Sequence, residues 1–262
     1  MPESAGTALL ELDGISKSFG RVVVADQLSL RIGERDMVGI VGPNGAGKTS
    51  LFSMIAGDLT PDAGQVRLGG AVVTRQSAAA RCRLGIGRTY QVPRPFGAMT
   101  VFENILVAVQ QGAGLRRAAS YLRAGEVMGR AGLEAEANSP AERLGLLQRK
   151  RLELARALAT RPRLLLLDEV AGGLTDPEVA QLVQIVHGIQ ADGVAIIWIE
   201  HVVRALTGTV DRLLCLAGGR FVGDGPPAEV LALPAVREVF LGTEVTTSLS
   251  GLTAEQPERE SS

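Results

Sequence analysis

Apolar residues fall into several short runs along the chain, and these runs predict strands. Met37 to Val41, Arg163 to Leu167 and Val194 to Ile199 are almost continuously apolar. Such runs are typical of parallel strands that are buried on both faces of a sheet. Leu9 to Ile15 and Val22 to Ile32 are separated by a short turn, which predicts an antiparallel pair. The pattern indicates an α/β fold with a parallel sheet and an antiparallel β subdomain.

Helical spacing of apolar positions marks other segments. From residue 99 to residue 145, apolar residues recur at three- and four-residue intervals, which predicts a helical insert subdomain. Leu152 to Leu158 predicts another helix. Asp176 to Ala191 opens with an Asp-Pro cap and first-turn pair, so we expect a helix there as well. Leu213 to Leu216 and Arg220 to Val222 complete the predicted sheet.

Composition limits the class of protein. A chain of 262 residues with 46% apolar residues can form one large domain, which we assign to residues 1–243. Residues 244–262 are rich in Thr, Ser, Glu and Gln, and we expect a disordered tail there. Because 27 basic residues balance 28 acidic ones, the net charge of −1 gives no overall attraction to nucleic acid. We therefore expect no nucleic-acid partner.

Neither a membrane span nor an exported protein is indicated. No stretch reaches the roughly 18 consecutive apolar residues of a membrane-spanning helix, and the N-terminus has no basic start or apolar core. Cys82 and Cys215 are too few and too far apart for a disulfide framework, which favours a reducing compartment. We expect a cytoplasmic protein whose membrane role, if any, depends on another subunit.

The segment from Gly42 to Ser50, G-P-N-G-A-G-K-T-S, predicts a cradle for nucleotide phosphates. Its glycines allow backbone N–H groups to turn onto phosphate oxygens at the start of a helix. Lys48 is expected to reach the outer phosphates, and Thr49 to bind Mg²⁺. The alternative is a plain glycine-rich turn, but a predicted strand and helix flank the motif. The predicted nucleotide-binding residues are Gly42, Asn44, Gly45, Ala46, Gly47, Lys48, Thr49 and Ser50.

Two acids follow the buried run that ends at Leu167. Because the ends of parallel strands converge on one crevice, Asp168 and Glu169 are expected to lie near the phosphate loop. Asp168 is predicted to hold Mg²⁺, and Glu169 to polarise the water that attacks the γ-phosphate. The alternative role of this acidic pair is a simple helix cap.

Three further residues have a functional and a structural interpretation. His201 follows a predicted strand and is expected to contact the γ-phosphate, although it is also explained as a surface or capping histidine. Gln91 is predicted to reach Mg²⁺ and the attacking water, against the alternative of an exposed loop glutamine. Phe19, in the turn between the first two strands, either stacks on adenine or covers the edge of a sheet, and local sequence leaves both open.

Taken in order, these motifs resemble the ATP-binding subunits of ABC transporters over nearly the whole chain. The resemblance rests on Phe19 and on the segments G-P-N-G-A-G-K-T, R-T-Y-Q, R-K-R-L-E-L-A-R-A-L-A, L-L-L-L-D-E and I-E-H. The segments R-T-Y-Q-V-P-R-P-F, E-H-V-V-R-A and V-F-L-G-T-E are similar to the branched-chain amino acid importer branch. The resemblance implies an ATPase at the cytoplasmic face of the inner membrane that binds ATP, Mg²⁺ and membrane permeases, and serves a periplasmic substrate-binding protein.

The same resemblance assigns roles by position. It implies that Phe19 stacks on adenine, that Asn44 to Ser50 form the Walker A loop, and that Gln91 is the Q-loop glutamine. Asp168 corresponds to the Walker B aspartate, Glu169 to the catalytic glutamate and His201 to the switch histidine. In this family two ATP-binding subunits enclose two ATP molecules, each lying between one chain's phosphate loop and the other chain's signature motif.

The signature motif departs from the family pattern L-S-G-G-Q. The corresponding residues are Leu144, Gly145, Leu146, Leu147 and Gln148. Glycine replaces the serine, so a hydroxyl is lost, and leucines replace both glycines where a close backbone approach is expected. Val170 and Thr175 also replace a usual proline and aspartate. We expect a second ATP-binding subunit as partner, in a homodimer or a heterodimer. Because the altered signature would impair the partner's site, the hypothesis is that this chain pairs with a different, more standard ATPase subunit.

Two other functions compete with transport ATPase. One is a soluble ABC-type ATPase outside transport, which usually shows tandem nucleotide domains or long coiled coils. The other is a nucleotide-binding subunit of low turnover, favoured by the altered signature and opposed by the presence of Glu169 and His201. The sequence does not identify the cargo: branched-chain amino acids are implied by the resemblance, and other small polar solutes remain open.

Overall fold

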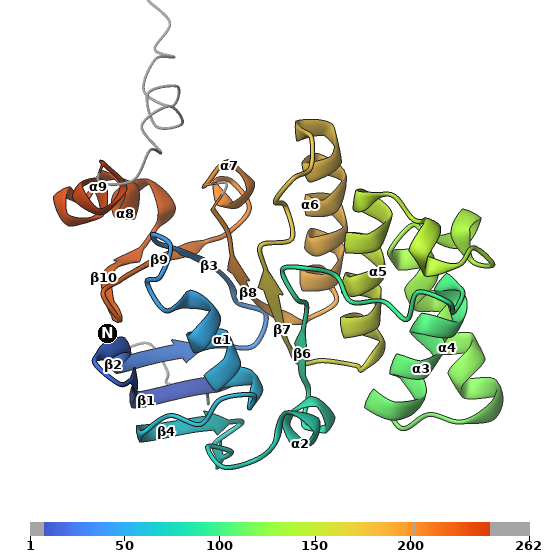
Figure 1. Cartoon of the computed structure of the whole chain (residues 1–262), viewed down its shortest axis with the longest axis horizontal. Coiled ribbons are helices and arrows are strands. Elements are labelled where there is room, and N and C mark those ends of the chain that lie inside the picture. Colours follow the sequence, from blue (N-terminus) through green and yellow to red (C-terminus); the bar gives the residue numbers. More distant parts are fainter. Residues whose placement is uncertain (1–7, 202, 242–262) are drawn as a thin grey trace, which may run out of the picture.

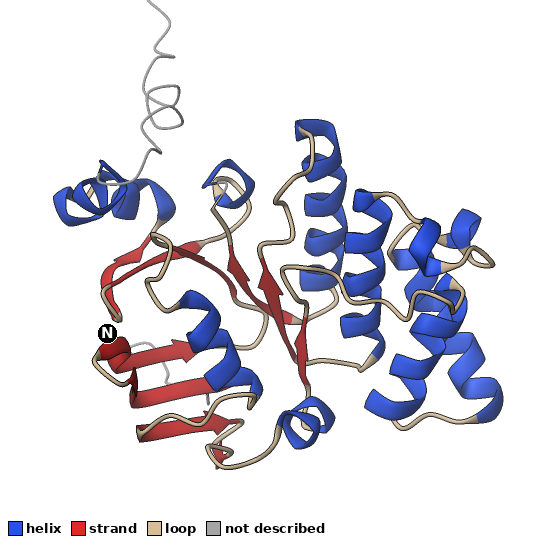
Figure 2. Cartoon of the chain, in the orientation of Figure 1, coloured by secondary structure: helices blue, strands red, loops and turns tan. Residues whose placement is uncertain are grey.

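A six-stranded sheet forms the centre of the protein in a computed structural model that describes residues 8–201 and 203–241 (Figures 1 and 2). The strand order is β10-β9-β3-β8-β7-β6. All neighbours pair in parallel except β10, which runs antiparallel to β9. The strands are β3 (Met37–Val41), β6 (Ile86–Arg88), β7 (Leu164–Asp168), β8 (Ala195–Ile199), β9 (Arg212–Ala217) and β10 (Arg220–Gly225). The predicted parallel sheet is confirmed.

A second, antiparallel sheet has the order β2-β1-β4-β5. It is formed by β1 (Leu10–Phe19), β2 (Val22–Ile32), β4 (Ala63–Leu68) and β5 (Ala71–Val72). The predicted antiparallel pair is confirmed: β2 has the predicted bounds, whereas β1 continues beyond the predicted Ile15 to Phe19. Phe19 is the last residue of β1 and pairs with Val22, so the prediction that it lies in the turn is wrong. The ladder extends to this point because Lys17 and Ser18 pair with Ala25 and Val23.

Helix α1 (Lys48–Ala56) packs between the two sheets, as Figure 1 shows. Alternation along the central strands separates two cores. Ile40 and Leu166 face the core that contains α1, whereas Leu165 and Trp198 face the core formed with the helices on the opposite side. Both faces of the sheet are therefore covered, which explains why its strands are continuously apolar.

The helices α3 (Val101–Gly112), α4 (Arg117–Arg130) and α5 (Leu146–Ala159) pack together beside the sheet (Figure 1). Two short 3₁₀ turns, Glu134–Glu136 and Ala141–Arg143, connect α4 to α5. Helix α5 begins before the predicted Leu152, because Gly145 is extended and the leucines after it already have helical geometry.

Helix α6 (Asp176–Ala191) has the predicted bounds. The side chain of Thr175 accepts from the backbone at Glu178, whose carboxylate accepts in return from Thr175. This reciprocal capping box, together with the proline in the first turn, fixes where the helix begins. The sequence did not predict α2 (Ala78–Arg83), α7 (Val203–Leu206), α8 (Pro227–Ala232) and α9 (Pro234–Leu241).

None of the helices within residues 8–201 and 203–241 is long and apolar enough to cross a membrane. The tail predicted at residues 244–262 lies outside the described residues.

Candidate functional site

The predicted site residues follow four strands of the central sheet and lie together at the carboxyl ends of those strands. Strands β3, β6, β7 and β8 are parallel, so their carboxyl ends lie together. The phosphate loop follows β3, Gln91 follows β6, Glu169 follows β7 and His201 follows β8. These segments surround a hollow of about 290 Å³ lined by Val24, Asn44, Gly45, Ala46, Gly47, Lys48, Thr49, Ser50, Gln91, Glu169 and His201.

The phosphate loop is held tightly against two neighbouring strands. A Cβ atom on Gly47 would lie 2.1 Å from the carbonyl oxygen of Val24 in β2, and one on Gly42 would lie 2.0 Å from that of Leu216 in β9. Both glycines also have positive φ angles, of 104° and 153°. Glycine is therefore required at both positions by the backbone conformation and by the close approach of β2 and β9, and the loop has a fixed place above the start of α1.

Lys48 is buried and turns back onto the loop. Its Nζ donates to the carbonyl oxygens of Gly42 at 2.7 Å and Pro43 at 3.0 Å. Burial lowers the pKa of Lys48, and the charges of Glu169 and Asp168 oppose that shift. The ammonium group thus lies inside the loop, at the position where phosphate oxygens would replace the two carbonyls as acceptors.

Glu169 is the point where the separate loops meet. His201 Nε2 lies 2.6 Å from one of its carboxylate oxygens, and the amide of Gln91 donates to the other. Glu169 also has a φ angle of 50°. A non-glycine residue in this left-handed region costs about 1–2 kcal/mol, so the surrounding structure must hold it there. The structure brings all three predicted residues together at the mouth of the phosphate loop.

Asp168 is buried beside a residue that the sequence analysis missed. Arg88, at the end of β6, donates from Nη2 to Asp168 Oδ2 at 3.2 Å and from Nη1 to Asp58 at 3.0 Å and to Ser53 at 3.1 Å. Burial raises the pKa of Asp168, and the charge of Arg88 opposes that shift. The signal was present in the sequence, since Arg88 is a charged residue directly after a short apolar segment and before Gln91.

The donor groups fit a magnesium ion better than a softer metal. Thr49 supplies a hydroxyl, Gln91 an amide and Asp168 a carboxylate, and Mg²⁺ prefers oxygen donors while retaining water and phosphate ligands. Within the described ranges, no three or more His, Cys, Asp or Glu side chains are grouped to hold a metal on their own. The residues present therefore suit an ion that arrives with a nucleotide.

Phe19 lies outside the hollow, and a different residue of the same hairpin lines it. The Phe19 ring is 52% exposed, and the ammonium of Lys17 lies 5.5 Å from its centroid. Val24 in β2 belongs to the lining, although the sequence analysis did not select it. The exposed ring leaves a flat apolar surface free for stacking, which stays a prediction.

The signature segment is the beginning of α5. Leu144 and Leu147 are buried in this chain's own structure, whereas Leu146 is 46% exposed. Of the two leucines that replace the signature glycines, Leu147 packs into its own chain because the helical turn directs it inward, and Leu146 is exposed. Leu146 is an exposed large hydrophobic residue at the start of the helix, and Gly145 before it carries no hydroxyl.

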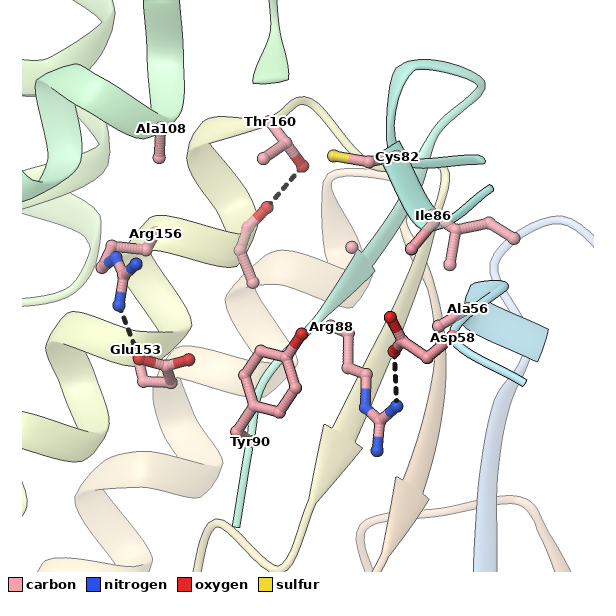
Figure 3. Close-up of a pocket in the computed structure, with 13 residues that line it drawn as sticks. Ala56, Asp58, Cys82, Ile86, Arg88, Tyr90, Ala108, Glu153, Arg156 and Thr160 are labelled. Carbon is pink, nitrogen blue, oxygen red and sulfur yellow. Dashed lines mark hydrogen bonds and ion pairs between the residues drawn. The ribbon is translucent and has the colours of Figure 1, made fainter. Parts of the chain in front are cut away.

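A second hollow lies beside the phosphate site, on the other side of Arg88. Figure 3 shows it between α5, α3 and β6, with Glu153 paired to Arg156 on one wall and Arg88 paired to Asp58 on the other. Its volume is about 220 Å³. Tyr90 is exposed at its edge, and Arg88 lies 5.2 Å from the centre of the Tyr90 ring. This groove is open and lined by both apolar and charged groups.

The fold and the converging loops define a P-loop ATPase. The chain belongs to the ABC transporter family, which matches residues 25–172. It is an ABC transporter ATP-binding subunit with the fold of the ATPase cassettes, which hydrolyse ATP and function as dimers with membrane permeases.

Curated relatives match nearly the full chain. The lipopolysaccharide export system ATP-binding protein LptB of Acidithiobacillus ferridurans is 33% identical over 90% of this chain and 98% of its own length. The high-affinity branched-chain amino acid transport ATP-binding protein LivG of Salmonella typhimurium is 33% identical over 89% of this chain and 98% of its own.

A solved structure supports the same fold. A nucleotide-free ATP-binding cassette from an ABC transporter superposes with a TM-score of 0.81 at 27% identity, covering 89% of this chain and 98% of the other.

Proposed function

We propose that this subunit hydrolyses ATP to energise the import of branched-chain amino acids or related small polar solutes. The observation that supports hydrolysis is the meeting of Gln91, His201 and Glu169 at the phosphate loop. The importer assignment is supported by LivG and by BraF of Pseudomonas aeruginosa, named for branched-chain amino acid transport and 32% identical over 89% of this chain. LptB is equally similar but named for export, so the cargo rests on the importer-like motifs as well.

The proposed chemistry assigns each group at the hollow one task. Backbone N–H groups from Asn44 to Ser50 bind the phosphates at the positive end of α1, and Lys48 stabilises the charge that develops on the γ-phosphate. Glu169 accepts a proton from the attacking water, and His201 orients the Glu169 carboxylate and contacts the γ-phosphate. Mg²⁺, held by Thr49, Asp168 and Gln91, would neutralise phosphate charge when bound.

We further propose that the working unit contains a second, different ATP-binding subunit. The start of α5 serves the partner's nucleotide in a shared site, and here it presents Leu146 and lacks the serine hydroxyl. This chain's own phosphate loop is intact, so one site of a mixed dimer would be competent and the other impaired.

A membrane permease is the other proposed partner, at the cytoplasmic face of the inner membrane. The groove of Figure 3 is lined by Tyr90, the residue before Gln91 in the chain, and its exposed aromatic edge and charged walls suit a short helix from a permease loop. Movement of that helix would reach the ATP site through β6 and the Gln91 segment. A periplasmic binding protein would then deliver cargo to the permease without touching this chain.

Glu169→Gln tests the proposed hydrolysis. This variant should bind ATP and accumulate as a closed dimer with its partner subunit, because it keeps the shape of the side chain and removes the base. Size-exclusion chromatography with and without ATP, together with phosphate release, measures both effects. Full turnover by Glu169→Gln, or a monomer under both conditions, contradicts the proposal.

Transport is tested separately in proteoliposomes that contain the permease subunits, both ATP-binding subunits and the binding protein. ATP inside the vesicles should drive uptake of labelled leucine, and glutamate and urea serve as competing cargoes. Hydrolysis without uptake of any of these solutes would contradict the importer assignment and retain the ATPase.

A further inference from the structure

A buried cluster behind Glu169 holds the turn that carries it. Lys150 lies in the second turn of α5 and is buried, and its Nζ donates to the backbone carbonyl oxygen of Glu169 at 3.0 Å. Two residues further along the turn, the backbone N–H of Ala171 donates to Glu200 Oε1 at 2.7 Å. The same turn is closed by the N–H of Gly172, which lies 3.4 Å from the Glu169 carbonyl oxygen. None of Lys150, Glu200 and Ala171 lines the phosphate hollow.

Glu200 directly follows β8 and is held by a residue of that strand. The indole N–H of Trp198, two residues earlier, donates to Glu200 Oε1 at 3.0 Å. The other carboxylate oxygen is buried and has no hydrogen-bond partner among residues 8–201 and 203–241. Glu200 therefore forms hydrogen bonds to the turn and to Trp198 while one of its own buried oxygens stays unpaired among the described residues.

Burying the charges of Lys150 and Glu200 costs desolvation free energy, which suggests that they are retained for a role that apolar residues could not fill. Burial lowers the pKa of Lys150 and raises the pKa of Glu200, and the charge of each opposes the shift of the other. Apolar side chains of similar size would fill the space without this desolvation. Apolar side chains could not form hydrogen bonds with the carbonyl oxygen of Glu169 and the N–H of Ala171. These two hydrogen bonds hold the turn that contains Glu169, whose φ angle is 50°.

We propose that Lys150 is a positioning residue for ATP hydrolysis, which acts with Glu200 to hold the Glu169 backbone in its left-handed conformation. In that conformation the Glu169 carboxylate reaches both Gln91 and His201. The inference rests on the proposed role of Glu169 in hydrolysis. Lys150 also follows Gln148 by two positions on α5, so the same contact joins the signature helix to the hydrolytic glutamate of its own chain.

The first test compares three substitutions on α5 in the assembled dimer. Lys150→Met should lower kcat about 100-fold, as expected for a misplaced reacting group, and leave the KM for ATP and the Kd of a fluorescent ATP analogue within about threefold. Lys150→Arg should recover most of the turnover, because a guanidinium also donates to a carbonyl. Arg151→Met removes the neighbouring positive charge, which contacts Gly132 and Gln181 instead, and should leave kcat unchanged.

A double-mutant cycle separates positioning from general stability. If Lys150 acts through the Glu169 carboxylate, adding Lys150→Met to Glu169→Gln should cause no further loss of single-turnover hydrolysis. An equal 100-fold loss in both backgrounds would overturn the proposal, and so would a Lys150→Met variant with normal kcat. By contrast, full turnover by Glu169→Gln would overturn the proposed role of Glu169 and this inference together.

A double variant without either charge controls for loss of stability. Lys150→Met alone leaves Glu200 as an uncompensated buried charge, which destabilises the fold. Lys150→Met with Glu200→Gln removes both charges and retains an oxygen that accepts from Ala171 and Trp198. This folded double variant should still show the loss in kcat, with ATP binding preserved. Normal kcat in the folded double variant would overturn the proposal.

Discussion

The phosphate loop and the signature helix are the two parts of this chain that we propose contact ATP, and they differ in how their residues are constrained. The loop is fixed by close backbone packing, since a Cβ on Gly42 or Gly47 would collide with a carbonyl oxygen of a neighbouring strand. The start of α5 is fixed mainly by burial of Leu147, while Gly145 and Leu146 are exposed. A change in the loop therefore disturbs the protein's own backbone, whereas a change at the exposed signature positions leaves the fold intact.

This difference explains how the two parts can diverge within one chain. The loop is proposed to bind this chain's own nucleotide, and almost any side chain at Gly47 would collide with β2. The exposed signature residues are proposed to act on a partner's nucleotide, so the chain can lose their function and keep its structure. An intact loop beside an altered signature is thus the physical basis for the proposed mixed dimer.

The largest expected effect is in the loop. Gly47→Ala should reduce ATP affinity about 1000-fold, or about 4 kcal/mol, because the new methyl group would lie 2.1 Å from the carbonyl oxygen of Val24. Gly208→Ala is the matched control, since Gly208 also has a positive φ, of 77°, but nothing lies within 4 Å of its added Cβ. Equilibrium binding of a fluorescent ATP analogue gives both affinities. Similar affinities for the two variants would show that the close approach to β2 does not fix the loop.

The next effect concerns the buried charges beneath the loop. Arg88→Ala should destabilise the protein by about 3 kcal/mol, because it leaves Asp168 buried without its cation. Arg31→Ala removes an exposed arginine from its pair with Glu11 and should cost less than about 1 kcal/mol. Urea unfolding of the two variants, each against the natural protein, measures the difference. If both variants lose the same stability, Arg88 does not support the site through Asp168.

The sequence predicted those features that are local in the chain. Continuous apolar runs identified β3, β7 and β8, and the order of strand, glycine-rich loop and helix located the phosphate loop. The start of α5 was missed because the altered signature removed the residues that mark it. The ion pair between Arg88 and Asp168 joins residues 80 positions apart, and the contact from Lys150 to Glu169 spans 19. Such partners are determined by the pairing of β6 with β7 and by the packing of α5 against the sheet, which no local pattern encodes.

At the signature, Leu146→Gly should raise the ATPase activity of the lone chain about 10-fold, equivalent to about 1.4 kcal/mol in the barrier. The reason is steric: Leu146 is the exposed bulky group at the start of α5, where the partner's nucleotide is proposed to bind. Leu122→Gly is the matched control, because Leu122 is an exposed leucine on α4. Phosphate release at saturating ATP measures turnover. An unchanged rate for Leu146→Gly would mean that this side chain is not the obstacle.

The smallest effect tests the residue before it. Gly145 is the N-cap of α5 and makes no side-chain hydrogen bond, so Gly145→Ser should add an acceptor for the free N–H groups of the first turn. The added Cβ would lie 2.9 Å from Gln148 Oε1, which is the end of a flexible side chain and can turn away. The expected gain is a few tenths of a kcal/mol, whereas Gly145→Ala should lose a similar amount because it offers no acceptor. Between serine and alanine the melting temperature should therefore differ by about 2 °C. Equal melting temperatures would show that a capping hydroxyl does not stabilise the start of α5, which would then depend on the packing of Leu147. The missing hydroxyl would in that case affect only the proposed contact with the partner's nucleotide.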